Sequence, residues 1–496
     1  RNMATDVCNQ LDKVTGDSQN PTSIPDDHFN LVSLSEHVNP VFRKEAKNCL
    51  KAIDVIFDEA SEVEKAESWL EWAKRFKYLK LVNTRVPDFI LPKNCSGELI
   101  DVKVFSKHGP DDPIYDAHKM VRDRVARGNC FLHLTKGKHR GPRCILYALK
   151  KFTGGLGDDD DNDKGDNTAW KQYFTKSIDK AKNIISTRKA NGEAAHLSCI
   201  QIDGQHIICA GSKNVHILIR NKEDIAFYRG DRYRIASEVC HTILDCLEEM
   251  ELAQKQRLLN FLTMTRLTAV FEILSPLHQH VEDLSAFKKP ALHFIAWTST
   301  DLEPMPGNQL CAFPPHIGIE IARALGLTTV EYISLHPSHL VDKMAQIRQG
   351  YQYEGEVLYF LDDENCVIGI LKKKTVWYII CRALREKVRN VIGTQLKHKS
   401  SFSLTKSVKL VEERLNEIQS WLVLSEQAIC QWKIVGIAFL KWSIEQLELG
   451  HLRMTDIADR FPIIWKRHLA ESNLSDHIVV ECTDESLESS DYSNHN

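Results

Sequence analysis

A run of short alternating strands joined by tight turns constrains the fold of this chain more than any other feature. Apolar and polar residues alternate from Ala194 to Ile202, an Asp203-Gly204 turn follows, and a second strand runs from His206 to Cys209. A third apolar strand, Val215 to Ile219, comes after the sequence Gly-Ser-Lys-Asn at 211–214. Two-residue turns that contain glycine connect antiparallel strands. The middle of the chain is therefore predicted to hold an antiparallel hairpin.

Further elements are predicted on both sides of this hairpin from apolar periodicity. One strand, Leu267–Leu274, carries Glu272 among apolar neighbours, and another follows Glu354-Gly355 as far as Leu361. A carboxylate inside an apolar run needs a partner, although most such residues are structural. Helical patterns are predicted over residues 41–81, 177–185, 233–264, 314–325, 340–348, 406–449 and 451–469.

Length, charge and cysteine usage limit the class of protein. A chain of 496 residues is long enough for two to four domains. Its net charge of −3 means that any surface for nucleic acid must be local. The 14 cysteines form no CxxC pair, which disfavours a structural zinc site and favours reduced thiols. No apolar run could span a membrane and no secretory leader is present, so we expect an intracellular protein, cytoplasmic or nuclear, without a membrane partner.

The stretch Lys189-Ala190-Asn191-Gly192-Glu193 lies directly before the hairpin and after the helix-like segment 177–185. A lysine that opens a strand pair, with a glycine three residues later, is where a covalent nucleotidyltransferase places its nucleophile. Such a lysine attacks the α-phosphate and carries the nucleotide as a phosphoramidate. Gly192 is expected to let the backbone approach the nucleotide, and neighbouring cations are expected to keep Lys189 uncharged.

Three charged stretches surround this lysine in the sequence. Residues 118–152 are strongly basic and include Arg127, which follows Ala126 and precedes a glycine turn into a strand. Residues 153–167 are rich in glycine and aspartate, so we expect a surface loop or a disordered insertion. Lys372, Lys373 and Lys374 end a strand, where they either meet an anion or form a solvated edge; Lys373 is expected to point away from the other two and to tolerate substitution.

Taken in order, these motifs resemble those of the ATP-dependent RNA ligases, within the covalent nucleotidyltransferase superfamily. The likeness is closest to phage-type RNA ligase and to the adenylyltransferase domain of fungal tRNA ligase. It covers about residues 86–390 and rests on Lys189-x-x-Gly192-Glu193, Gly-Ser-Lys-Asn at 211–214, Phe271-Glu272, Glu354-Gly355 and Lys372-x-Lys374-x-x-Trp377-Tyr378, with Ala126-Arg127-Gly128 and Lys151-Phe152 upstream. Two departures are Asn191, where DNA ligases and capping enzymes often have aspartate, and the acidic insertion before Lys189.

The resemblance implies an α+β fold with an antiparallel-sheet nucleotidyltransferase core, of the ATP-grasp-like ligase kind. It implies an adenylyltransferase domain over residues 86–390. The residue patterns outside that range predict a helical N-terminal extension (1–85), a helical C-terminal domain (391–475) and a disordered acidic tail (476–496). The resemblance implies Lys189 as the nucleophile and Glu354 as the ligand of Mg²⁺ or Mn²⁺. The implied nucleotide-binding residues are Arg127, Lys151, Asn191, Gly192, Glu193, Glu272, Glu354, Gly355, Lys372 and Lys374; Ser212, Lys213 and Asn214 are implied to lie nearer the RNA.

The implied reaction is the ATP-dependent sealing of a 5′-phosphate RNA end to a 3′-hydroxyl end, in RNA repair or tRNA splicing. Separate healing enzymes, a kinase and a phosphoesterase, would be its partners. Three alternatives remain open. One is another covalent nucleotidyltransferase, such as an mRNA guanylyltransferase. A second is a two-histidine RNA-end phosphoesterase, because His133-Leu134-Thr135 and His196-Leu197-Ser198 fit its repeated element. A third is an RNA-binding scaffold without activity.

Overall fold

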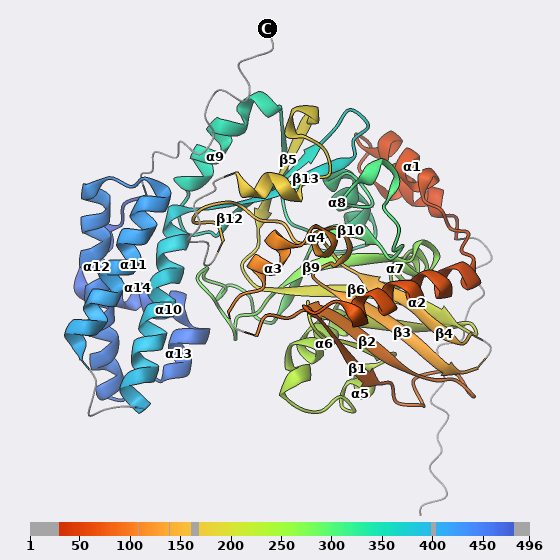
Figure 1. The fold of residues 1–496 in the computed structure, drawn as a ribbon, viewed down its shortest axis with the longest axis horizontal. Coiled ribbons are helices and arrows are strands. Elements are labelled where there is room, and N and C mark those ends of the chain that lie inside the picture. Colours follow the sequence, from red (N-terminus) through yellow and green to blue (C-terminus); the bar gives the residue numbers. More distant parts are fainter. Residues whose placement is uncertain (1–28, 108, 138, 160–167, 398–402, 481–496) are drawn as a thin grey trace, which may run out of the picture.

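Three antiparallel sheets and a C-terminal helical bundle form the fold of the computed structural model (Figure 1). The structure describes residues 29–107, 109–137, 139–159, 168–397 and 403–480. The predicted α+β class, with antiparallel sheets and a helical C-terminal region, is confirmed. The predictions for residues 1–27 and for most of the tail lie outside the described residues. Within the described ranges, no helix has the length and apolar character needed to cross a membrane.

The five-stranded sheet contains the predicted hairpin and has the strand order β10-β9-β6-β7-β8. Its strands are β6 (Glu193–Ile202), β7 (Gln205–Gly211), β8 (His216–Ile219), β9 (Leu267–Leu274) and β10 (Ala291–Ser299). The Asp203-Gly204 turn joins β6 to β7 with positive φ angles of 50° and 80°, as the favoured two-residue hairpin turn requires. Helices α6 (Arg234–Glu249), α7 (Leu252–Thr265) and α8 (Pro315–Ala324) pack against this sheet.

The second sheet brings three of the sequence motifs side by side. Its order is β11 (Tyr332–Leu335), β5 (Asn183–Lys189), β12 (Gly355–Leu361) and β13 (Val367–Lys374). In the antiparallel register, Gly355 lies opposite Lys189 on one side and opposite Lys374 on the other. The lysine motif, Glu354-Gly355 and the lysine triplet therefore meet in one row at the end of the sheet.

Two predicted helices are wrong. Residues 177–185 form the short 3₁₀ helix η3 (Ile178–Lys180) and then strand β5. Ile184 and Ile185 enter different apolar clusters, as successive residues of a strand do. Because β5 is buried on both faces, it lacks the apolar–polar alternation that identifies a half-exposed strand. The single helix predicted over 233–264 is divided into α6 and α7, because the backbone is extended at Met250 and Glu251.

A third sheet joins the N-terminal residues to the middle of the chain. Its order is β1 (Leu79–Arg85), β2 (Ser96–Val104), β3 (Asn129–Lys136) and β4 (Gly141–Tyr147). The N-terminal helices are η1 (Leu31–His37), α1 (Arg43–Ala52) and α2 (Glu59–Arg75). Helix α2 packs on β4, and its Trp69 ring lies 5.1 Å from the ring of Phe131. The segment 1–85, expected to be a helical extension, thus supplies a strand of this sheet.

Short helices complete the part of the fold that contains the sheets. They are α3 (Asp112–Ala117), α4 (Lys119–Arg124), η2 (Ala169–Tyr173), α5 (Lys222–Ile225), η4 (Asp231–Tyr233), η5 (Pro306–Asn308), η6 (Pro337–His339) and α9 (Leu340–Arg348). The start of α3 places Asp111 and Asp112 beside Arg127 and Lys151, two of the basic residues that precede the lysine motif.

The C-terminal bundle has its own apolar core. It consists of α10 (Val376–Lys397), α11 (Leu404–Leu422), α12 (Glu426–Glu448), α13 (Met454–Asp459), α14 (Phe461–Ser472) and η8 (Ser475–His477). Its core runs from Val376 through Trp432 and Phe439 to Leu469. A single residue, Thr375, separates β13 from α10, so the boundary expected at residue 390 falls inside a continuous helix. The bundle is therefore joined directly to the strand that carries the lysine triplet (Figure 1).

The buried Trp432 should dominate the stability of the bundle. Its side chain is fully buried and its indole N–H donates to the carbonyl of Val479 at 2.7 Å. Trp432→Ala is expected to lower the free energy of unfolding of the bundle by about 3–5 kcal/mol, through lost burial and a residual cavity. Ile434→Ala, on the same helix with Ile434 47% exposed, is the matched control and should cost less than about 1 kcal/mol. Denaturant titration followed by helical circular dichroism measures both, and equal losses would contradict this packing.

Candidate active site

A cavity of about 460 Å³ lies between the five-stranded sheet and the sheet that contains β5. Strands β5, β12 and β13 form one wall, and β6 and β9 form the other. Most of the residues expected to bind nucleotide line it: Arg127, Lys151, Lys189, Asn191, Gly192, Glu193, Glu272, Glu354, Lys372 and Lys374. Its volume is in the range of cofactor and nucleotide sites.

Lys189 and Glu354, which both line this cavity, form an ion pair. The Nζ of Lys189 lies 2.9 Å from Oε1 of Glu354, and the Nζ of Lys374 lies 3.9 Å from the same oxygen. The side chain of Glu354 is 4% exposed. The next residue must be a glycine for a separate reason, because a Cβ on Gly355 would lie 2.0 Å from the carbonyl oxygen of Lys373 on the paired strand β13. The row of strand ends therefore fixes a lysine and a carboxylate in contact.

The charge state of Lys189 differs from the expectation based on the sequence. Burial by itself lowers the pKa of Lys189, but the carboxylates of Glu354 and Glu272 outweigh burial and raise it above its usual value. The prediction that neighbouring cations keep this amine uncharged is wrong for the resting protein. The expected lowering of the pKa is found instead at Lys374, where burial and the charge of Lys372 lower the pKa of the amine to about 8.

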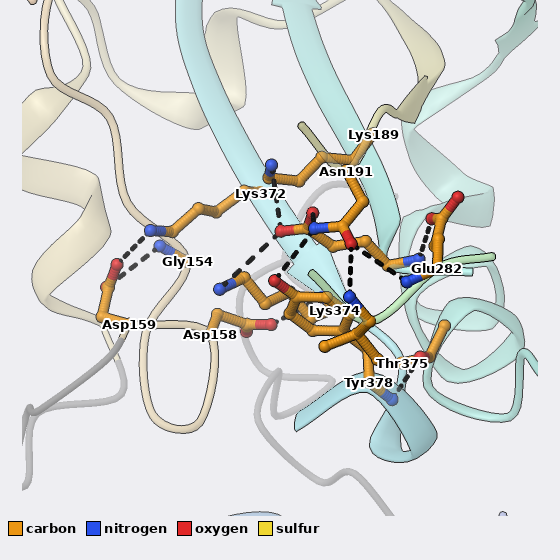
Figure 2. A network of polar contacts seen from close by, with 12 residues as sticks. Gly154, Asp158, Asp159, Lys189, Asn191, Glu282, Lys372, Lys374, Thr375 and Tyr378 are labelled. Atoms are coloured by element: carbon orange, nitrogen blue, oxygen red, sulfur yellow. Dashed lines mark hydrogen bonds and ion pairs between the residues drawn. The ribbon is translucent and has the colours of Figure 1, made fainter. Parts of the chain in front are cut away.

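Asn191 holds the cavity wall together. Its amide nitrogen donates to Oε2 of Glu354 at 2.8 Å and to the hydroxyl of Tyr378 at 3.2 Å. Its amide oxygen accepts from the backbone N–H groups of Val281 and Glu282, both at 3.1 Å. Figure 2 shows Asn191 beside Lys189 and Tyr378. An amide fills a donor and an acceptor role at once, which the aspartate common in the DNA ligase motif cannot do while ionised.

Glu272 and Gly192 form the opposite wall. The backbone N–H of Gly192 donates to Oε1 of Glu272 at 3.1 Å. Burial, with a contribution from Glu354, raises the pKa of Glu272 to about 7. A Cβ on Gly192 would lie 2.1 Å from the carbonyl oxygen of Ile273. The glycine is thus required by the close approach of β9, which differs from the expected approach to a nucleotide. Glu193 lies at the rim, where it contacts His280.

Carboxylates of the cavity suit a hard divalent cation. Glu354 and Glu272 both line the space beside Lys189. Mg²⁺ commonly takes one or two protein carboxylates and completes its shell with water and substrate phosphates. Glu354, with Glu272 as a second oxygen donor, therefore fits the metal role expected from the sequence.

Of the four cations expected to bind phosphate, Arg127, Lys151 and Lys372 are each paired with an aspartate, whereas Lys374 lies near Glu354. Arg127 lies 2.5 Å from Asp111, and Lys372 lies 2.5 Å from Asp159. Lys151 pairs with Asp112. Burial, together with the nearby charges of Lys372 and Arg127, lowers the pKa of Lys151 to about 8. The sequence alone assigns no role to these aspartates, because only the fold brings them to the cations.

The acidic segment after Thr153 is where the sequence prediction fails most clearly. Asp158 and Asp159 are buried, being 0% and 6% exposed, although the segment was expected to remain at the surface or disordered. Asp158 accepts two hydrogen bonds from Arg348 at 2.7 and 2.8 Å, and one from the backbone N–H of Lys374 at 2.6 Å. Residues 160–167 of the segment lie outside the described residues. Buried arginine and lysine partners compensate the desolvation of these carboxylates.

Lys373 also departs from expectation. It does not line the cavity, in agreement with its opposite orientation, but it is buried and lies 3.9 Å from Asp158. A neutral substitution there would leave Asp158 with less compensation, so we expect Lys373 to tolerate it less well than an exposed lysine would.

The residues expected near RNA divide into two groups. Ser212, Lys213 and Asn214 form the turn from β7 to β8, where the N–H of Ser212 donates to the carbonyl of Val215 at 2.9 Å. Of the three, only Lys213 lines the cavity. Two further cations, Arg382 and Arg385 of α10, line the cavity as well.

The two histidines of the phosphoesterase alternative do not share a site. His196 lines the cavity but is 1% exposed and hydrogen-bonds His216 at 3.1 Å. His133 does not line this cavity. His216 in turn lies 2.6 Å from Asp101, near Cys130, in a buried cluster whose Asp101 and His216 already satisfy each other. The paired histidines that such an enzyme needs around one phosphate are therefore not brought together.

Comparison with protein families gives one match. A family model described as a domain of unknown function, DUF7920, matches residues 97–385. This range includes every residue that lines the cavity except Glu386, and it ends within α10. No curated protein matches the chain.

The role of Asn191 can be tested with the aspartate of the DNA ligase motif. Asn191→Asp would place a second carboxylate 2.8 Å from Glu354 and remove a donor. We expect the free energy of unfolding to fall by about 3 kcal/mol near neutral pH, because two buried carboxylates then face each other. Asn221→Asp is the control: Asn221 caps α5 by accepting from the backbone N–H of Asp224, a role that aspartate fills equally well. Equal stability of both variants in denaturant titrations would show that Asn191 does not hold Glu354.

Proposed function

The chain belongs to the family of the domain of unknown function DUF7920, and from the chemistry of its cavity we propose that it is an ATP-dependent RNA ligase. It would join a 5′-phosphate RNA end to a 3′-hydroxyl end through a lysyl-AMP intermediate. The observation that supports this most strongly is the contact between Lys189 and Glu354 within a cavity that also holds Glu272, Lys372 and Lys374. An RNA-binding scaffold has no need for a nucleophile and cations arranged around one cavity.

In the first step the Lys189 ammonium gives up one proton, and the neutral Nζ then attacks the α-phosphorus of ATP. Oε1 of Glu354, 2.9 Å from the amine, is placed to accept this first proton. A P–N bond forms, the bond to pyrophosphate breaks, and the departing pyrophosphate takes the second proton of the nitrogen. Lys372 and Lys374 supply positive charge where negative charge develops on the phosphates. Pyrophosphate then leaves.

In the second step an oxygen of the RNA 5′-phosphate attacks the same phosphorus, and Lys189 leaves as the amine. In the third, the 3′-hydroxyl of the other RNA end attacks the 5′-phosphorus and AMP leaves. Both steps need oriented phosphates more than an amine nucleophile. A divalent cation held by Glu354, when bound, supplies additional neutralisation of phosphate charge. Lys213, Arg382 and Arg385 at the cavity are suited to contact the RNA phosphates.

The role of Lys189 as the nucleophile can be tested by measuring the first step and the last step separately. Lys189→Ala should form no covalent adduct with labelled ATP on a denaturing gel, and should not seal 5′-phosphate RNA. The same variant should still join RNA that already carries AMP on its 5′ end, because that step breaks a bond to AMP without using the lysine. Lys182→Ala, an exposed lysine just before β5, is the control and should label normally.

Two outcomes would change the proposal. An adduct of wild-type intensity in Lys189→Ala would remove Lys189 from its role. Labelling of the unaltered protein by GTP in preference to ATP would favour guanylyl transfer, as in mRNA capping, over ligation.

A further inference from the structure

Three cations that line the cavity, Arg127, Lys151 and Lys372, are each paired with an aspartate that does not itself line it. Asp159 contacts Lys372 at 2.5 Å, Asp111 contacts Arg127 at 2.5 Å, and Asp112 contacts Lys151. Figure 2 shows Lys372 extended toward Asp159. These cations are the ones expected to meet the phosphates of ATP under the proposed function. A carboxylate and a phosphate oxygen compete for the same N–H donors.

Asp158 and Asp159, which are neighbours in the acidic segment, have different structural roles. Asp158 is an anchor: it accepts from both terminal nitrogens of Arg348 and from the backbone of Lys374. Besides its contact with Lys372, Asp159 accepts from two local groups, the hydroxyl of Thr153 and the N–H of Gly154 at 3.3 Å. The carbonyl of Thr153 accepts from the N–H of Lys372 at 3.2 Å, which holds the segment along β13. The anchor thus places the Asp159 carboxylate against the lysine.

The carboxylates of Asp159 and Asp112 are both charged in the resting protein. Although burial alone would raise the pKa of Asp159, Lys372 and Lys151 hold it below its usual value. Burial likewise opposes ionisation of Asp112, and Lys151 again lowers its pKa. A polyphosphate that approached Lys372 and Lys151 would therefore meet cations whose charge these aspartates already compensate.

We propose that Asp159, together with Asp112, is an internal competitor for the polyphosphate subsite, so that an entering polyphosphate must displace these carboxylates from Lys372 and Lys151. The inference rests on the proposed function only in naming the polyphosphate as that of ATP. The competition weakens the binding of simple anions to the cavity. It also makes release of the aspartates part of nucleotide binding, since Lys372 cannot hold both partners at full strength.

The test is the affinity of the full chain for inorganic tripolyphosphate, measured by isothermal titration calorimetry without divalent cations. Asp159→Asn keeps the shape of the side chain and removes its charge, so affinity should rise about three- to tenfold. Asp112→Asn, on a different element, should also raise it and provides a second variant if the first folds poorly. Asp301→Asn is the control, because Asp301 pairs with Lys65 at the surface, away from the cavity.

Two further outcomes separate the possible roles. Asp158→Asn should lower the melting temperature without tightening tripolyphosphate binding, because Asp158 anchors the segment. Unchanged or weaker tripolyphosphate binding in both Asp159→Asn and Asp112→Asn would overturn the competition and make these aspartates supports for the lysines. The proposed function is tested separately: absence of a lysyl-AMP adduct in the unaltered protein would refute ligation and leave the tripolyphosphate result standing.

Discussion

The ion pair between Lys189 and Glu354 is the interaction on which the rest of the cavity depends. Removing one partner from a buried pair typically costs about 3–5 kcal/mol, because the other charge remains without compensation. The structure holds Glu354 with three groups, Lys189 at 2.9 Å, Asn191 at 2.8 Å and Lys374 at 3.9 Å. Asn191 ties that carboxylate to α10 through Tyr378. The bundle, β13 and the lysine are therefore connected, and the placement of the amine depends on all three.

Much of this arrangement could be predicted from the sequence. The β6–β7 hairpin follows from alternation and the Asp203-Gly204 turn, and β9 follows from an apolar run with one carboxylate. Glu272 stands out because a carboxylate inside an apolar strand needs a partner, whereas Lys189 stands out by its spacing to Gly192, and Glu354 by the resemblance to the RNA ligases. The structure brings these three into one cavity. For β6, β7 and β9 the local pattern was sufficient, because the sequence of each of these strands indicates which residues are buried.

Buried charges whose partners lie far away in the sequence could not be predicted from the sequence. Asp158 and Asp159 belong to a run of aspartates and glycines with little apolar surface to bury, and their burial depends on Lys372 and on Arg348, which lies 190 positions after Asp158. Strand β5 gives no strand pattern because neighbours on both faces and both edges cover it. The raised pKa of Lys189 depends on its distances to Glu354 and Glu272. Each of these failures involves a partner that only the tertiary fold supplies.

The central claim is that one amine, that of Lys189, becomes covalently bound to AMP. Peptide mass spectrometry of the unaltered protein after incubation with ATP and Mg²⁺, under conditions that preserve phosphoramidates, tests this most directly. We expect an AMP group on the peptide that contains Lys189, lost on treatment with acid and reversed by added pyrophosphate. An AMP group located on another residue, such as Lys374 or Lys151, or no covalent AMP at all, would contradict the claim.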